Sequence, residues 1–453
     1  MRFTPPPIEI NEDEGFSFDK DIFKLEDFGK GLTNLVSNLE DPMVIAFSGQ
    51  WGSGKTVFLK MWRGELKKAG FPVIYFDAYE NDYVEDAFAV LAREIIELTE
   101  TNKGALNAVA KGFKSSAVDL GKMLLVGTAK AATKAVVRAA TAGVVSADDI
   151  SSSFSAETVD TAADYLQEVF LKPKEQKLTV TAFREALSEL PKRLSPPKEG
   201  VTQKPLIFII DELDRCKPQF ALAILERIKH FLSVPNVHFV LGVNLTQLRN
   251  SVKAAYGSEI DASTYLQKFI NLTVTHVDSN RDAHARHITK YIEYLRNALN
   301  FKEEDRETLD NVSTFLLRVA EQHALSLRTI ERIFSQVAVC LAFTQKKNLR
   351  PGPIVAGLCI LKVIEPEKFA KAKTGKLRYE DVEALFGFKP VSKTASDEEE
   401  RDWERDWWQI CLLDEVPPRL TEFGKHLRSY GIYDGGKGVL QLIANQIVDR
   451  LKP

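Results

Sequence analysis

Four short runs of apolar residues recur along the chain, and each of them ends in glycine or polar residues. They cover residues 42–48, 71–77, 205–210 and 237–243 and are rich in branched and aromatic side chains, which is typical of buried strands. Apolar residues at helical spacing follow the first three runs, which predicts an amphipathic helix after each. Strands that alternate with helices indicate an open α/β sheet.

The rest of the chain divides by its pattern into further parts. A short helix is predicted over Gly31 to Leu39, and mostly helical patterns run from about Ser251 to Phe343. Charged residues dominate 371–405, which predicts a solvated linker. The predicted organisation is therefore an N-terminal segment (1–41), a core in two parts (42–103 and 205–250), a helical insertion (104–204), a helical lid or bundle (251–370), and a linker with a small C-terminal element (371–453).

The first apolar run leads into the sequence Gly49-Gln-Trp-Gly-Ser-Gly54-Lys55-Thr56. A strand, a glycine-rich loop and a helix in this order predict a phosphate-binding loop, because glycines let successive N–H groups face one anion. Lys55 is expected to reach the β- and γ-phosphates, and the Thr56 hydroxyl to hold Mg²⁺. The predicted nucleotide-binding residues are Gly49, Gln50, Trp51, Gly52, Ser53, Gly54, Lys55, Thr56 and Val57.

Two carboxylates, Asp211 and Glu212, end the third apolar run, and ligands of open α/β sheets bind at that end. Asp211 is predicted to hold Mg²⁺ with Thr56, and Glu212 to act as general base on the attacking water. Asn244 ends the fourth run and is predicted to orient that water. The alternatives are ordinary strand-end acids and a simple turn asparagine.

Composition narrows the function classes. The net charge of the 453 residues is −3, so no basic field draws the protein to nucleic acid. The four cysteines are far apart, which argues against a zinc site and suits a reducing compartment. We expect a cytoplasmic protein with no signal peptide, and no uncharged run reads as an integral membrane span. No Asn-Lys-x-Asp motif is present, which favours ATP over GTP.

Residues 104–150 differ in composition, with Lys130, Lys134 and Arg138 spaced four apart on one helical face. One interpretation is an inserted helical hairpin with a solvated basic face. The other is a surface that rests on anionic lipid or on a protein partner, which would give peripheral membrane association.

Five stretches together resemble the KAP family of P-loop NTPases. They are the phosphate-loop motif 49–56, Tyr75-Phe-Asp-Ala-Tyr79, Ile210-Asp-Glu-Leu-Asp-Arg-Cys-Lys-Pro218, Leu241-Gly-Val-Asn244 and Tyr265-Leu-Gln-Lys-Phe269. The resemblance covers roughly residues 15–345. It implies a three-layer α/β P-loop NTPase with an additional-strand, catalytic-glutamate (ASCE-type) parallel sheet and a C-terminal helical domain.

The same resemblance implies ATP-dependent switching through assembly, in bacteria often in defence against phage with a separate effector protein. It makes Arg328 a candidate sensor arginine and Arg215 a candidate for contacts between subunits. The leading hypothesis is a Mg²⁺-dependent ATPase switch that forms a homo-oligomer. The alternatives are a nucleotide-dependent scaffold that does not hydrolyse ATP, and an AAA+-like ATPase that remodels nucleic acid.

Overall fold

The computed structural model describes most of the chain outside a long central segment. Described are residues 2–39, 41–84, 87–101, 184–185, 187–196, 203–231, 234–275, 281–323, 325–344, 351–388, 402–415, 420–421 and 437–449. The basic segment 104–150 lies outside them, as does nearly all of the predicted insertion. The described chain forms two compact units, one mainly of residues 9–276 and one mainly of residues 277–453, the latter including residues 1–8 and 50–53.

The first unit contains a five-stranded sheet with the order β2-β3-β4-β1-β5, in which every described pairing is parallel. The four predicted strands are present as β1 (Val44–Ser48), β2 (Val73–Asp77), β3 (Leu206–Asp211) and β4 (Val237–Val243). β5 (Leu272–Val274) was not predicted, because three residues are too few to show a pattern. β4 lies between β1 and β3, so one additional strand separates the glycine-rich loop from the acidic pair.

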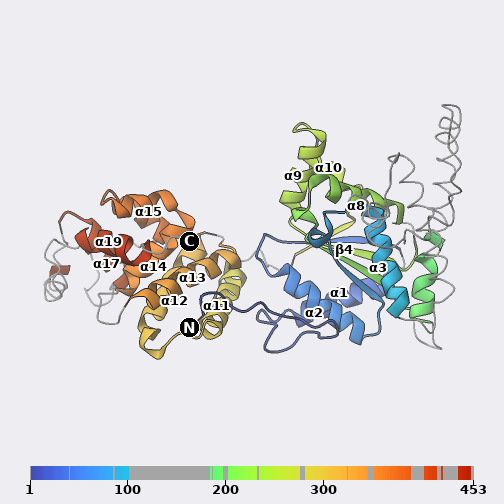
Figure 1. Ribbon diagram of the computed structural model, residues 1–453, viewed down its shortest axis with the longest axis horizontal. Helices are drawn as coiled ribbons and strands as arrows, with labels where there is room; N and C mark the ends of the chain where they lie inside the picture. The colour runs from blue at the N-terminus through green and yellow to red at the C-terminus, as the bar shows by residue number, and fades with distance from the viewer. Residues whose placement is uncertain are drawn as a thin grey trace, which may run out of the picture. The chain divides into compact units, whose positions relative to one another are not determined.

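Helices cover both faces of this sheet, which gives three layers (Figure 1). On one face, α1 (Glu26–Asn38) and α2 (Lys55–Lys68) pack on Phe47, Ile209 and Val240. On the other face, side chains such as Phe208 and Phe239 meet the remaining helices. These helices are α3 (Ala87–Thr101), α8 (Pro218–Phe231), α9 (Leu245–Tyr256) and α10 (Ala262–Leu266). The three-layer α/β prediction is confirmed.

The first helix begins earlier than its pattern predicts, at Glu26 rather than at Gly31. The cause is Asp21, whose carboxylate accepts the backbone N–H groups of Leu25 and Glu26 at 2.8 and 3.1 Å. These N–H groups have no partner inside a helix, so a carboxylate there stabilises its first turn.

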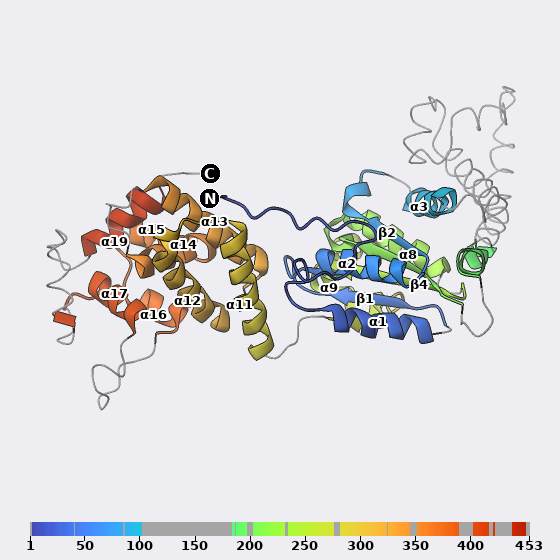
Figure 2. The ribbon, with the colours of Figure 1, turned by 90° about the horizontal axis from the view of Figure 1, so that it is seen from below.

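The second unit is helical. It consists of α11 (Arg281–Ala298), α12 (Arg306–Gln322), α13 (Leu327–Phe343), α14 (Gly352–Ile364), α15 (Pro366–Lys373), α16 (Glu380–Phe386), α17 (Trp403–Leu412), α19 (Lys437–Ile443) and a π-helical turn (Ala444–Val448). Residues 352–361 of α14 are all buried, with α12, α13, α15 and α17 against this helix (Figure 2). A helix that is apolar all round belongs in the centre of a core.

Part of the segment predicted as a linker is helical in the structure. Residues 371–388 include the end of α15 and all of α16. Phe386 is fully buried, with its ring centroid 4.5 Å from that of Phe315 and 5.0 Å from that of Trp408. A few buried apolar side chains, among them Tyr379, Phe386 and Phe388, pack this segment against the helical core, although its composition is that of a solvated stretch. Among the described residues, no helix is long and apolar enough to cross a membrane.

Candidate nucleotide site

The glycine-rich loop has a backbone that only glycine adopts easily. Gly52 and Gly54 have φ angles of 75° and 88°, in the left-handed region that is strained for residues with a side chain. Gly54 is the residue before α2 and makes no side-chain hydrogen bond to the first turn of the helix. N–H groups at a helix start, together with the helix dipole, attract an anion.

Lys55 lies at the start of α2 and is 8% exposed. Its Nζ donates a hydrogen bond to the carbonyl oxygen of Gly49 at 2.8 Å, so the ammonium group rests on its own loop. Burial lowers the pKa of Lys55, while the nearby carboxylates of Asp214 and Asp211 act in the opposite direction. A buried cation above a loop of N–H groups is suited to a phosphate chain.

Asp211 is the last residue of β3 and is 1% exposed. Its Oδ2 accepts from the Tyr75 hydroxyl at 2.8 Å, and its Oδ1 accepts from the Glu212 N–H at 2.9 Å. Burial raises the pKa of Asp211, and the hydrogen bonds from Tyr75 and Thr56 lower it. A buried carboxylate beside a threonine hydroxyl provides two of the oxygen ligands that Mg²⁺ prefers.

Glu212 follows in a left-handed conformation, with φ 59° and ψ 23°. Such a conformation costs on the order of 1 kcal/mol or more for a residue other than glycine and is concentrated at functional sites. The carboxylate forms an ion pair with Arg215 at 2.8 Å and lies 3.5 Å from the Thr56 hydroxyl. Burial raises the pKa of Glu212 and Arg215 lowers it. The structure thus brings Glu212, Asp211 and Thr56 together at the carboxyl end of the sheet.

Asn244 follows β4, the strand between β1 and β3, and it is the residue before α9. Its Oδ1 accepts from the N–H groups of Thr246 and Gln247 at 3.0 and 3.4 Å. This is the turn role named as the alternative, and it leaves the amide nitrogen as the atom available to a water. Arg328 lies in the first turn of α13, in the helical unit, and its role as a sensor stays a prediction.

Two residues at this site were missed by the sequence reasoning. Tyr75 was quoted only for the family resemblance, although its hydroxyl contacts Asp211. Gly242 pairs with Asp211 on the neighbouring strand, and a Cβ added there would lie 2.2 Å from Asp211 Oδ1 and 2.6 Å from Leu59 Cδ1. A glycine inside a strand pattern signals a close approach of another group, and that signal was present.

These residues fit a Mg²⁺–nucleotide complex. Within the described parts of the chain, no group of three His, Cys, Asp or Glu side chains could hold a metal ion. A cation at Thr56 and Asp211 would therefore need phosphate oxygens and water as its other ligands, as Mg²⁺ at nucleotide sites usually does.

Comparison with known protein families supports this assignment. The family model of the KAP family P-loop domain matches residues 27–343, well over half of the chain. The chain belongs to the KAP family of P-loop NTPases. The resemblance found in the sequence is therefore confirmed, and a KAP domain is a nucleotide-binding domain of the P-loop class. No curated protein matches the chain significantly.

Several solved structures are similar in outline. Drosophila ORC bound to DNA has 12% identity and a TM-score of 0.34, and the match covers 82% of this chain and 83% of that chain. AMPPCP-bound DnaA from Aquifex aeolicus has 13% identity and a TM-score of 0.32, with 98% and 99% covered. The ORC2 protein of Aeropyrum pernix has 13% identity and a TM-score of 0.31, with 95% and 98% covered. Overlaps this loose do not transfer the function of those proteins to the KAP chain.

Proposed function

We propose that this KAP protein binds and hydrolyses ATP with Mg²⁺ and uses the reaction to switch its conformation or its assembly. The observation that carries the proposal is the convergence of four side chains on the carboxyl end of β3. Lys55 and Thr56 come from α2, and Asp211 and Glu212 come from the end of β3. The Thr56 hydroxyl forms a hydrogen bond with Asp211 and lies 3.5 Å from the Glu212 carboxylate, and both carboxylates are near enough to act on the pKa of Lys55. A P-loop scaffold that only binds nucleotide does not need a strained, half-buried glutamate next to the carboxylate that would hold the metal ion.

Each side chain has a distinct task. Lys55 would break its hydrogen bond to the Gly49 carbonyl oxygen and donate to the phosphates instead. Its positive charge would stabilise the negative charge that develops on the phosphate oxygens in the transition state. Thr56 and Asp211 would hold Mg²⁺, which when bound neutralises the β- and γ-phosphate oxygens. Glu212 would accept a proton from the attacking water, once its carboxylate is free of Arg215.

The test of hydrolysis is the variant Glu212→Gln in the full chain. Glutamine keeps the shape of the side chain but is not a base, so ATP binding should persist while turnover falls about 100-fold or more. Calorimetry measures the binding and phosphate release measures the turnover. Glu226→Gln, on α8, is the matched control and should hydrolyse ATP normally. Wild-type turnover in Glu212→Gln would place the base elsewhere, with Asp214 as the first alternative.

The switch itself is assigned to Arg328. A cation from the helical unit that contacts the γ-phosphate would favour one conformation only while ATP is intact, and such differential contact is what shifts an equilibrium. Its support is the family resemblance and the buried stripe of Ile330, Ile333 and Val337 that holds the first turns of α13. Arg328→Ala should bind ATP but lose the ATP-dependent change in small-angle scattering or in elution volume. A change equal to that of the wild type would exclude this role.

Defence against phage through a separate effector protein is a further part of the proposal, and it rests on the family resemblance. A pull-down with Glu212→Gln under ATP should then enrich one effector chain. The same protein without nucleotide is the control. If Lys55→Ala still protects cells in an infection assay, defence does not depend on ATP binding.

The alternative of nucleic-acid remodelling has its own test. Salt-dependent binding of the protein to DNA or RNA would favour that alternative.

A further inference from the structure

The feature that carries a further inference is the hydroxyl group of Tyr75 on the sheet edge. β2 is the last strand of the sheet, and its residues pair with β3 in the register Tyr75 with Ile209 and Asp77 with Asp211. Paired residues of parallel strands point to the same face, so Tyr75 and Asp211 share the face covered by α2. They are offset by two residues, about 6.6 Å along the strands, a gap that only a long side chain closes.

The Asp211 carboxylate is confined from both neighbouring strands. On the β2 side, the Tyr75 hydroxyl donates to Oδ2 at 2.8 Å. On the β4 side, Gly242 leaves room for Oδ1, because a Cβ there would lie 2.2 Å from it. The backbone N–H of Glu212, the next residue in the chain, donates to Oδ1 at 2.9 Å. The Asp211 carboxylate is thus held by one backbone N–H and by the hydroxyls of Tyr75 and Thr56, and of these two hydroxyls only that of Tyr75 is not itself a predicted metal ligand.

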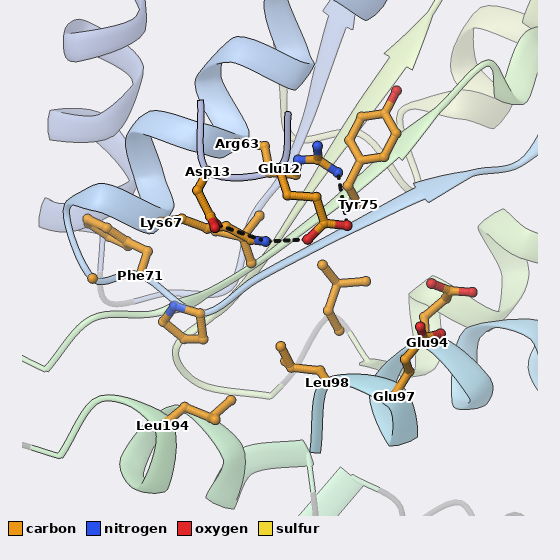
Figure 3. A pocket seen from close by; sticks show the side chains of 14 residues that line it. Glu12, Asp13, Arg63, Lys67, Phe71, Tyr75, Glu94, Glu97, Leu98 and Leu194 are labelled. Carbon is orange, nitrogen blue, oxygen red and sulfur yellow. Dashed lines mark hydrogen bonds and ion pairs between the residues drawn. The ribbon is translucent and has the colours of Figure 1, made fainter. Parts of the chain in front are cut away.

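Tyr75 is itself held in place by α2, the helix that carries Lys55 and Thr56. The guanidinium of Arg63 lies 5.1 Å from the centre of the tyrosine ring, and the ammonium of Lys60 lies 5.7 Å from it. The ring forms part of the wall of a cavity of about 450 Å³ beside β2. Figure 3 shows its hydroxyl directed away from the ion pairs that Glu12 makes with Lys67 and Arg63 in that cavity.

The environment keeps this hydroxyl a donor. Burial and the neighbouring Asp211 raise the pKa of Tyr75, so the phenol holds its proton. A phenol that donates to a buried carboxylate stabilises the charged form, the form that binds a metal ion.

We propose that Tyr75 is a positioning residue for the magnesium site, and that its hydroxyl orients the Asp211 carboxylate toward the cation. The inference rests on the proposed ATPase function and deepens it, since Tyr75 would not touch nucleotide or metal. Groups that hold a metal ligand in this way commonly change metal affinity or activity by about 10- to 100-fold when they are removed.

The test is Tyr75→Phe in the full chain, which removes the hydroxyl and keeps the ring beside Arg63 and Lys60. Binding of a fluorescent ADP analogue is titrated with Mg²⁺, and the same analogue is titrated in EDTA. The Mg²⁺ midpoint should rise about tenfold or more, with the affinity in EDTA and the melting temperature close to those of the wild type. Tyr265→Phe, which loses a hydroxyl bonded to Tyr256 and Glu226, is the control and should leave the midpoint unchanged.

The outcomes separate the two proposals. If the wild type binds the analogue with no response to Mg²⁺, the proposed function itself fails. If the wild type responds and Tyr75→Phe has the same midpoint, the role of Tyr75 is excluded. Should Tyr75→Phe fold poorly, 3-fluorotyrosine at position 75 replaces it. Its ¹⁹F resonance should move when Mg²⁺ joins bound ADP, and an unmoved resonance would also exclude the role.

Discussion

The two units of this chain differ in the groups that contact their buried or partly buried carboxylates. In the helical unit, Arg318 on α12 places its guanidinium 2.9 Å from Asp402 and 3.5 Å from Glu404, at the start of α17. In the α/β unit, Asp211 accepts hydrogen bonds from the hydroxyls of Tyr75 and Thr56 and from the backbone N–H of Glu212, and none of these donors carries a charge. The first carboxylates have their counter-charge within the fold, whereas Asp211 is oriented by neutral donors.

This difference is the one expected between a charge that supports the fold and a charge that binds a ligand. A buried ion pair closed within the fold needs nothing more, and removing one partner leaves the other uncompensated. A buried carboxylate held by neutral donors is costly to ionise, and a bound cation would offset that cost. The direction of the Asp211 shift, a pKa raised by burial, agrees with this view. The four predictions below test it, starting with the largest expected effect.

Lys55→Ala should abolish nucleotide binding. The site otherwise consists of backbone dipoles, so the lost point charge should weaken binding by about 100-fold or more. Isothermal calorimetry with ATP in the presence of Mg²⁺ checks the result. Lys68→Ala is the matched control, because Lys68 lies on the same helix and is exposed beside Glu65. Equal affinity in Lys55→Ala and the wild type would contradict the site.

Much of this site followed from the sequence, because its parts are local in the chain. The strand, the glycines and Lys55 are consecutive, and Asp211 and Glu212 follow directly on a run of apolar residues. Patterns of this kind fix the end of the sheet at which side chains gather. The structure shows the four predicted strands within two residues of their predicted bounds.

The remainder of the site depends on pairings between strands that are distant in the chain. Tyr75 reaches Asp211 across 136 positions, and Gly242 approaches it through the register of β4 with β3. Neither pairing register can be read from one sequence, since each follows from packing of the whole sheet. The prediction of a solvated linker over the segment that contains α16 was wrong for a related reason. Phe386 finds its partners, Phe315 and Trp408, only in the folded core.

Gly242→Ala tests whether room for the carboxylate matters. The added Cβ would overlap Asp211 Oδ1 and Leu59 Cδ1, so the carboxylate must turn and the strand must shift. We expect a loss of about 1–3 kcal/mol in the free energy of unfolding, with a fall in Mg²⁺-dependent nucleotide binding. Gly31→Ala, where a Cβ has open space in α1, should instead be neutral or stabilising. Chemical denaturation and the Mg²⁺ titration measure the two effects, and a normal titration in folded Gly242→Ala would oppose the proposed geometry.

Arg318→Ala tests the closed ion pairs of the helical unit. The variant leaves Asp402 and Glu404 partly buried without their cation, which should cost about 1–2 kcal/mol of unfolding free energy, between the values for surface and fully buried pairs. Nucleotide affinity at saturating Mg²⁺ should stay unchanged, because the ion-pair partners of Arg318 are Asp402 and Glu404, which are not residues of the candidate nucleotide site. Differential scanning calorimetry and ATP titration give the two readouts. If Arg318→Ala kept the melting temperature of the wild type but bound ATP more weakly, Arg318 would serve nucleotide binding rather than the stability of the helical unit. Arg306→Ala, which breaks an exposed pair with Glu303, is the control and should change little.

The smallest effect concerns His238, a titratable residue buried in the same sheet as Asp211. It lies near the start of β4 and is fully buried, whereas the nucleotide site lies at the other end of that strand. Burial lowers the pKa of His238, with the Leu39 carbonyl acting in the opposite direction. The folded protein therefore binds fewer protons than the unfolded chain, so stability is full above the ordinary histidine pKa of about 6.5 and is lost as the pH falls below it. At pH 5.5 the loss can be at most about 1.4 kcal/mol, the value set by protonation of the histidine in the unfolded chain.

His238→Leu should remove that acid dependence and leave ATP turnover at neutral pH unchanged, because the residue is far along the strand from Asp211. Denaturation curves at pH 7.5 and 5.5 for the wild type and the variant give the difference of differences, in which the other titrating groups cancel. His323→Leu, in the helical unit, is the control and should retain the acid dependence of His238. If His238→Leu hydrolysed ATP poorly at neutral pH, His238 would belong to the nucleotide site. In this sheet, burial alone would then not separate groups that bind a ligand from groups that only pack.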